Sequence, residues 1–128
     1  MAITSLDHIN IRTAELERTR AFFRDVLGLT EGWRPPFPFN GAWLYAGGRD
    51  VVHLVEVDIA AEPSRGSSLD HFAFAIDDYD DAVRQLDGAG MTYRATTTPG
   101  TTTRQIFVTE LNGVTIELNC RGAVGEPT

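Results

Sequence analysis

The chain has 128 residues, of which 42% are hydrophobic and 23% charged, and its formal net charge at pH 7 is −7. This length and composition are typical of one globular domain that is large enough to bury a core. The acidic balance, with no cluster of basic residues, argues against nucleic acid and anionic membrane surfaces as partners. The single cysteine, Cys120, excludes an intrachain disulfide and a cysteine-rich zinc site.

The N-terminal residues enter a strand-like pattern at once. They lack the basic stretch and the apolar segment that characterise a signal peptide. No apolar run approaches the roughly 18–20 residues that are needed to span a bilayer. We therefore expect a cytoplasmic protein with no membrane partner.

The first half of the chain predicts strands around one helix. Apolar and polar side chains alternate over residues 3–12, which indicates a strand. A helix is predicted over 14–27, because apolar residues recur there at helical spacing between a capping Thr13 and a terminating Gly28. The proline-rich residues 34–41 predict a loop. Three further strands are expected in this half, at 29–33, 42–46 and 51–57.

The second half repeats this order after a linker. Residues 59–68 are rich in small and polar side chains and predict that linker. A second helix is predicted over 79–89, capped by Asp77 or Asp78 and ended by Gly90. The remaining expected elements are strands at 69–76, 91–97, 103–110 and 114–120, followed by a frayed tail at 121–128.

An internal repeat divides the chain. The tripeptide Leu-Asp-His precedes an apolar strand twice, at 6–8 and at 69–71. Each half is therefore interpreted as a βαβββ module, the first at about 3–58 and the second at about 69–120. We expect an α+β fold in which the modules form an open, cleft-bearing, barrel-like sheet of eight strands with two main helices, within one domain over 1–128.

The repeat also aligns the residues that can bind a metal. His8 and His71 open the matching first strands, and the separation from His8 to His53 differs by one residue from that between His71 and Glu117. Three imidazoles and one carboxylate suit Zn, Ni, Co, Mn or Fe(II). A lone histidine in an apolar strand is more often a core residue, but four positions matched by a repeat favour a metal site. Glu56 competes with His53, because their odd separation places them on opposite faces of a strand.

The sequence resembles the vicinal oxygen chelate superfamily. That superfamily includes glyoxalase I, extradiol dioxygenases, methylmalonyl-CoA epimerase, fosfomycin resistance thiol transferases and bleomycin resistance proteins. The resemblance covers about residues 3–120 and implies a pair of βαβββ modules, a divalent metal, and a substrate that chelates the metal through two oxygens. The segments that carry the resemblance are residues 6–11, 20–29, 69–74 and 112–118.

The resemblance also implies roles for individual residues. By position, His8, His71 and Glu117 match the most widely shared ligands. His53 matches the fourth ligand position, which is Glu or Gln in glyoxalase and epimerase members, and this departure weakens a glyoxalase assignment. Small members commonly form homodimers, so we expect one here, and the four ligands could come from one chain or from two.

Three functions stay open at this stage. The first is a glyoxalase I-like lyase, isomerase or epimerase that works through an enediolate, with Glu117 as the base and Glu56 as the second candidate. The second is an extradiol-type Fe(II) dioxygenase, for which His8, His71 and Glu117 supply two histidines and a carboxylate. The third is a metal-free drug-binding protein of the bleomycin resistance type.

Each function requires a small-molecule substrate or ligand and a pocket for it. Aromatic residues of the first half could wall an aromatic substrate, although core packing is the plainer interpretation for Trp43. Arginines could hold an acidic group, and the candidates are Arg12, Arg34, Arg94 and Arg104. The residues predicted to line the pocket are Trp33, Phe37, Phe39, Trp43, Tyr45, Arg104 and Phe107.

Overall fold

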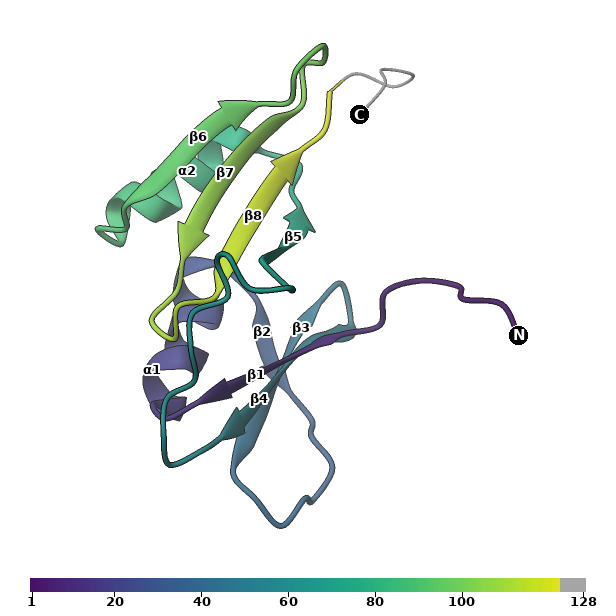
Figure 1. Ribbon diagram of the computed structural model, residues 1–128, viewed down its shortest axis with the longest axis vertical. Helices are drawn as coiled ribbons and strands as arrows, with labels where there is room; N and C mark the ends of the chain where they lie inside the picture. Colours follow the sequence, from purple (N-terminus) through teal and green to yellow (C-terminus); the bar gives the residue numbers. More distant parts are fainter. Residues whose placement is uncertain (123–128) are drawn as a thin grey trace. The chain divides into compact units, whose positions relative to one another are not determined.

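The computed structural model describes residues 1–122, and the chain divides into two compact units between Ala61 and Glu62. This division falls within the segment 59–68 that the sequence predicts as a linker. Each unit has the βαβββ order, so the α+β class and the paired modules are confirmed (Figure 1). Within the described residues, no helix has the length and apolar content that crossing a bilayer requires.

The first unit contains one four-stranded sheet. Its strand order is β1-β4-β3-β2, in which β1 and β4 run parallel and the other neighbours run antiparallel. The elements in chain order are β1 (Ile9–Thr13), α1 (Leu16–Ala21), the π-helical turn η1 (Phe22–Val26), β2 (Thr30–Gly32), β3 (Gly41–Ala46) and β4 (Arg49–Glu56).

The second unit repeats this topology. Its sheet has the order β5-β8-β7-β6, with β5 and β8 parallel and the other neighbours antiparallel. The elements are β5 (His71–Ala75), α2 (Tyr79–Gly88), β6 (Tyr93–Thr97), β7 (Arg104–Thr109) and β8 (Thr115–Cys120). The eight strands therefore form two separate sheets rather than one continuous sheet.

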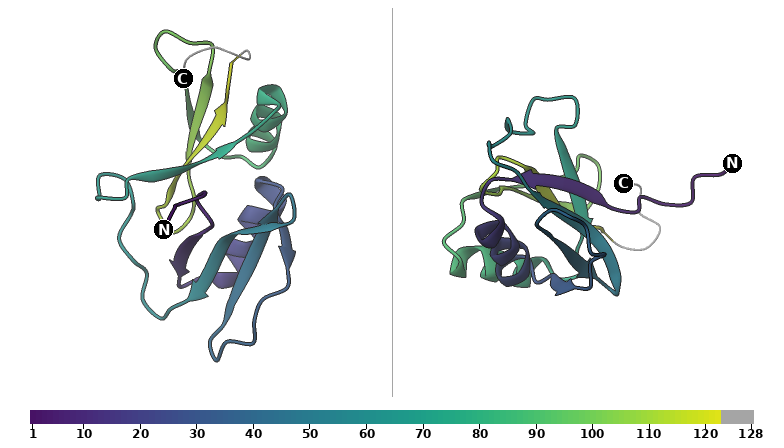
Figure 2. Two further views of the ribbon diagram at one scale, coloured as in Figure 1. Left: turned by 90° about the vertical axis from the view of Figure 1, so that its right-hand side faces the viewer. Right: turned by 90° about the horizontal axis from the view of Figure 1, so that it is seen from below.

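One face of each sheet is covered by the helix of the same unit. In the first unit, α1 lies against β3 and β4, and in the second unit α2 lies along one face of its sheet (Figures 1 and 2). The side chains between helix and sheet are almost fully buried in both units. Large members of these cores are Phe23, Leu44 and Leu54 in the first unit and Leu86, Ile106 and Ile116 in the second.

The first helix departs from its prediction. The sequence predicts one helix over 14–27, but α1 begins at Leu16 and gives way to the π-helical turn at Phe22. Phe22 and Phe23 are both buried, with their ring centroids 5.3 Å apart. The wider π turn adds a residue to the helical turn, and two consecutive phenylalanines then both enter the core.

The start of the first unit also differs from the prediction. The strand predicted over 3–12 begins only at Ile9, and the side chains of Ile3 and Leu6 are exposed. Alternation of apolar residues indicates a strand but does not supply a partner strand for it. Thr13, predicted as the helix cap, instead accepts a hydrogen bond from the Glu15 backbone N–H at 2.9 Å, one turn before the helix.

The hairpin between β7 and β8 is organised by a buried carboxylate. Glu110 is 2% exposed, and its side chain accepts hydrogen bonds from the backbone N–H groups of Asn112 and Val114 and from the Asn112 side chain. Gly113 supplies the positive φ of 82° that this turn requires. Burial raises the pKa of Glu110 above its ordinary value, against the opposing effect of these donors.

Candidate functional site

The strand register places the repeated residues on one face of each sheet. Paired residues on neighbouring strands point to the same side of a sheet, and so do residues two apart on one strand. In the first unit, His8 lies two residues before Asn10, which pairs with His53. In the second unit, His71 lies two residues before Ala73, which pairs with Glu117. His53 and Glu117 therefore occupy equivalent points of the two modules, on the face that the helix does not cover.

Three rings form a stack on this face of the first unit. The ring centroids of His8 and His53 lie 3.7 Å apart, and those of His53 and Trp43 lie 3.9 Å apart, with nearly parallel planes in both cases. Trp43 is the cross-strand partner of His53, which explains their contact. We call His8, His53 and Trp43 the imidazole stack. It holds the half-exposed His8 ring in one orientation against a buried neighbour.

An aspartate engages the central ring of this stack. The Nε2 atom of His53 lies 2.7 Å from the Oδ2 atom of Asp50, three residues earlier on β4. This hydrogen bond is the main cause that lowers the pKa of Asp50 below its ordinary value. Any direct bond from His53 to a metal would therefore use Nδ1, or would require the Asp50 contact to break.

Aromatic side chains extend from the imidazole stack into the proline-rich loop. The Trp33 ring meets Trp43 edge-on, with centroids 6.1 Å apart. Phe37 and Phe39 stack on one another, and the Arg34 guanidinium carbon lies 5.1 Å from each of their centroids. A small recess of about 110 Å³ is lined by Arg34, Phe37, Phe39, Trp43 and His53 among others.

The second unit brings an imidazole and a carboxylate together. The Nε2 atom of His71 lies 3.3 Å from the Oε1 atom of Glu117. Gln105 donates a hydrogen bond of 3.2 Å to the other carboxylate oxygen, Oε2, and the Phe107 ring meets His71 edge-on at 5.5 Å. We call His71 and Glu117, two of the candidate metal ligands, the ligand pair. Both residues are held by side chains of their own unit.

Each Leu-Asp-His repeat pairs its histidine with the preceding aspartate. The Nδ1 atom of His8 lies 2.7 Å from Asp7, and that of His71 lies 2.8 Å from Asp70. A carboxylate accepts only, so Nδ1 donates in both pairs, and in the neutral imidazole this leaves on Nε2 the lone pair that a metal requires. This is the arrangement that commonly orients a histidine ligand of a metal. The backbone N–H of Gly66 also donates to Asp70 and is the largest cause of its lowered pKa.

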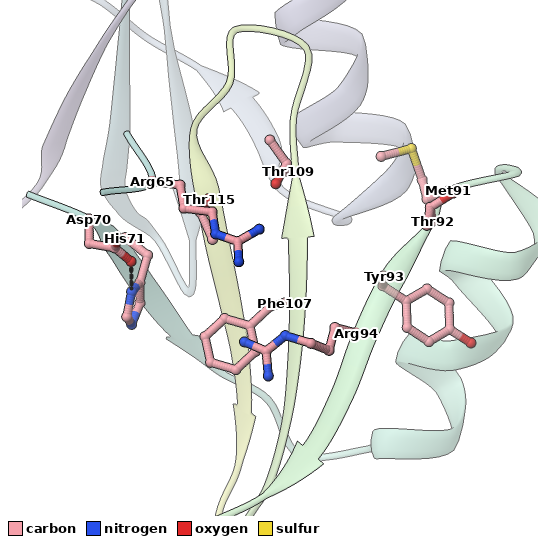
Figure 3. Close-up of a pocket in the computed structure, with 10 residues that line it drawn as sticks. All are labelled: Arg65, Asp70, His71, Met91, Thr92, Tyr93, Arg94, Phe107, Thr109 and Thr115. Carbon is pink, nitrogen blue, oxygen red and sulfur yellow. Dashed lines mark hydrogen bonds and ion pairs between the residues drawn. The ribbon is translucent and has the colours of Figure 1, made fainter. Parts of the chain in front are cut away.

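A cavity of about 610 Å³ opens beside the ligand pair, within the second unit. Figure 3 shows that its polar lining comes from the linker, from β5 and from the three other strands. Two arginines, Arg65 and Arg94, extend over the face that carries His71. The lining residues are Arg65, Asp70, His71, Met91, Thr92, Tyr93, Arg94, Phe107, Thr109 and Thr115. We call this space the basic cavity.

The ligand pair fits a divalent metal in chemistry and in spacing. An imidazole nitrogen and a carboxylate oxygen are ligands that Zn²⁺, Fe(II) and similar ions accept. Two such donors at about 2.1 Å from one ion lie roughly 3.0 to 3.4 Å apart, and the pair lies 3.3 Å apart. Within residues 1–122, no three His, Cys, Asp or Glu side chains form a cluster that could hold an ion. A complete metal site therefore needs ligands in addition to this pair.

The structure distributes the other predicted site residues over different faces. Phe107 lines the basic cavity, whereas Arg104 places its guanidinium 4.0 Å from the ring centroid of Tyr79 on α2. Glu56 is exposed at the end of β4 and accepts a hydrogen bond from Asn40. Tyr45 donates to the backbone carbonyl of Trp33. Arg104 is thus remote from the ligand pair of the second unit, and Glu56 is remote from the imidazole stack of the first unit.

Several residues of the site were not predicted. Asp7 and Asp70 were visible as part of the repeated tripeptide, which is the signal that could have found them. Asp50 gave no such signal, because its odd separation from His53 along β4 predicts side chains on opposite faces. Arg65 gave none because it lies in the linker. Gln105 could have been inferred from its position opposite the strand that carries Glu117.

Comparison with protein families gives one match over most of the chain. The model of the Glyoxalase/Bleomycin resistance protein/Dioxygenase superfamily matches residues 5–118. Among curated proteins, the uncharacterized protein YaeR of Escherichia coli (strain K12) is 28% identical, over 92% of this chain and 97% of that protein.

Solved structures share the fold at low identity. The fosfomycin resistance protein FosX from Listeria monocytogenes superposes with a TM-score of 0.76 at 20% identity, covering 98% of both chains. A putative glyoxalase family protein from Bacillus anthracis gives a TM-score of 0.79 at 21% identity, covering 94% of this chain and 98% of that one. Lactoylglutathione lyase from Agrobacterium tumefaciens gives 0.70 at 15% identity, covering 94% and 96%.

Proposed function

We propose, from the premise that the chain belongs to the Glyoxalase/Bleomycin resistance protein/Dioxygenase superfamily, that it is a divalent-metal-dependent enzyme acting on a small oxygenated substrate. The observation that carries the proposal is the 3.3 Å approach of His71 Nε2 to Glu117 Oε1. In this proposal, His8, His71 and Glu117 bind the metal. Members of the superfamily commonly use divalent metals, and solved relatives of this fold include a lyase and a fosfomycin resistance protein.

The preferred chemistry is proton transfer of the glyoxalase I type, in a lyase, isomerase or epimerase. A bound metal would supply Lewis-acid polarisation of a substrate carbonyl. Glu117 then takes a proton from the carbon beside the carbonyl and returns it to the substrate. Gln105 fixes the Glu117 carboxylate through Oε2, and the low exposure of Glu117, 7%, limits its exchange with bulk water. Glu56, the second candidate base, has no part in this proposal.

His53 has a supporting role in this proposal. Its Nε2 atom is bonded to Asp50, and its ring lies flat against His8. We propose that His53 orients the His8 ring, so that Nε2 of His8 keeps one direction. A direct bond from Nδ1 of His53 to the metal is the alternative, and it corresponds to the fourth ligand that the resemblance implies.

A second candidate function is supported by the aromatic residues of the first unit. Trp33, Phe37 and Phe39 are 70%, 43% and 44% exposed, which is unusual for large aromatic side chains. Exposed rings beside the imidazole stack favour a planar aromatic substrate. With iron as the metal, this observation favours an extradiol-type dioxygenase over proton transfer.

Elemental analysis of protein purified anaerobically, without chelators or a His-tag, tests the proposal. About one divalent metal per chain supports it, and the identity of the metal selects the reaction. Nickel, cobalt, zinc or manganese directs activity assays to hemithioacetals and 2-oxo thioesters, and iron directs them to catechols. Protein that stays metal-free after reconstitution with each ion contradicts both enzyme proposals and leaves a drug-binding protein.

A further inference from the structure

We propose that the basic cavity is an oxyanion subsite, in which Arg65 and Arg94 bind a carboxylate or phosphoryl group of the substrate. This inference rests on the proposed function in one respect: it assigns the anionic end of the same substrate whose oxygens chelate the metal. The cavity itself, about 610 Å³, has the size of a small-molecule site.

Hydrogen bonds fix the backbone on both sides of Arg65. The backbone N–H of Ser64 donates to the carbonyl of Gly113 at 3.0 Å, and the Ser64 hydroxyl accepts from the Thr115 N–H at 2.8 Å. On the other side, the N–H of Gly66 donates to Oδ1 of Asp70 at 2.6 Å. Arg65 therefore belongs to a turn that is fastened to β8 and to the aspartate that orients His71. The backbone of Arg65 is thus a fixed part of the cavity wall, and its exposed side chain extends from there beside the cavity (Figure 3).

Arg94 is fixed by its place in the sheet. It pairs with Phe107 across β6 and β7, and Phe107 pairs in turn with Glu117 across β7 and β8. The three side chains consequently share one face, and the guanidinium carbon of Arg94 lies 4.4 Å from the Phe107 ring centroid. A guanidinium stacked on a ring keeps its N–H groups at the edge available for a planar or tetrahedral oxyanion.

Neither of these two arginines forms an ion pair with a carboxylate of the described residues, although Asp70 lines the same cavity as Arg65. Most arginines on the helices and at their ends form ion pairs, as Arg18, Arg20, Arg24 and Arg84 do with nearby carboxylates. Within residues 1–122, neither Arg65 nor Arg94 has a carboxylate within 4.0 Å. Other arginines of the described residues, such as Arg12 and Arg49, also form no ion pair, but Arg65 and Arg94 are distinguished by lining one cavity. In a chain whose net charge is −7, two such guanidinium groups beside one cavity favour an anionic ligand.

The carboxylates nearest the cavity are already engaged. Both oxygens of Asp70 accept hydrogen bonds, from Gly66 and from His71. Glu117 is held by Gln105 and lies against His71. An oxyanion can therefore approach the two guanidinium groups without displacing a protein carboxylate from them. Its other end then lies toward His71, which lines the same cavity.

Titration of the metal-free protein with inorganic phosphate and with acetate tests this subsite, with the Nε–Hε signals of the arginines observed by NMR. All 11 Lys and Arg residues of the chain are arginines, so every such side chain is observed in this spectrum. We expect saturable shifts confined to Arg65 and Arg94, against chloride at equal ionic strength. Tighter phosphate binding assigns a phosphoryl substrate, and tighter acetate binding assigns a carboxylate.

The variants Arg65→Gln and Arg94→Gln should each weaken anion binding about tenfold, because each removes a charge-assisted contact. The matched control, Arg84→Gln, removes an exposed arginine of α2 and should bind as the parent does. Equal binding by all three variants, or shifts spread over all arginines, overturns the subsite. Metal content, measured on the same samples, separates this failure from failure of the metal proposal, because anion binding is observed without metal.

Discussion

The two units have the same topology but present different chemistry on the face that the helix leaves uncovered. The first unit carries an imidazole stack that continues into exposed aromatic rings, and the second carries the ligand pair beside two arginines. The feature that both retain is the Asp-His pair that opens the first strand. The repeat thus preserves the orientation of one histidine in each unit, and the differing residues around it set what else each unit can bind.

The largest expected effect concerns the acidic member of the ligand pair. Glu117→Gln should abolish stoichiometric binding of Mn²⁺ or Zn²⁺ in calorimetric titration, because it removes the one anionic ligand. The stability should change little, since Gln fills the same space and can still meet Gln105.

Glu56→Gln is the matched control. Glu56 also lies on the last strand of its module, but within residues 1–122 its carboxylate is hydrogen-bonded to the Asn40 side chain and not to a histidine. Its metal affinity should equal that of the parent. Loss of binding in the Glu56 variant and retention in the Glu117 variant would contradict the equivalence of His53 and Glu117.

The next effect compares the two Asp-His pairs. Asp7→Asn and Asp70→Asn should each weaken metal binding by about 10- to 100-fold, because each removes the carboxylate that orients a ligand histidine. Asp70→Asn should also reduce anion binding, because Asp70 fixes the turn that carries Arg65.

Asp7→Asn should leave anion binding unchanged, since the basic cavity lies within the second unit. The comparison would break down if Asp7→Asn impaired anion binding as much as Asp70→Asn.

A smaller effect concerns pH and stability in the second unit. Burial raises the pKa of Glu110 in the folded state, so the folded protein binds a proton more tightly than the unfolded chain. Its contribution therefore favours the folded state at low pH and is lost as pH rises through the interval above the unfolded value of about 4.3.

Glu110→Gln should remove this dependence. The melting temperature of the variant minus that of the parent should therefore increase with pH over that interval. A difference that decreases with pH would show that the donors around Glu110 outweigh its burial.

The smallest effect has the opposite sign and belongs to the first unit. The hydrogen bond from His53 lowers the pKa of Asp50, so its contribution to stability is present above the unfolded value of about 3.9 and is lost as pH falls through the lowered folded value. Asp50→Asn should flatten the acid limb of the stability profile.

Acid melting curves of the parent and of Asp50→Asn give this comparison directly. Parallel curves below pH 4 would mean that the contact between Asp50 and His53 does not affect stability.

The repeat explains how much could be predicted from sequence. Leu-Asp-His occurs twice and His53 aligns with Glu117. These two observations were sufficient to predict the paired modules and, within each module, the sheet face that carries the candidate ligands. Alternation along a strand determines sidedness, so the opposite placement of His53 and Glu56 was also predictable.

Other features depend on contacts that are distant in sequence. Arg65 lies in a linker whose composition predicts only a loop, and hydrogen bonds to Gly113, Thr115 and Asp70 fix its place. The π turn at Phe22 accompanies the burial of two adjacent phenylalanines, which helical spacing alone does not predict. The sequence predicts the aromatic residues of the first half as a pocket lining, but the repeat gave no indication that the second half would carry a basic cavity in their place.

The measurement that tests the central claim most directly is the response of the imidazole nitrogens to one equivalent of Zn²⁺, observed by ¹⁵N NMR. The chain has three histidines, so each signal can be assigned. We predict that the Nε2 signals of His8 and His71 shift while their Nδ1 protons, bonded to Asp7 and Asp70, are retained. Unchanged Nε2 signals for both histidines at full equivalence would contradict the proposed metal site.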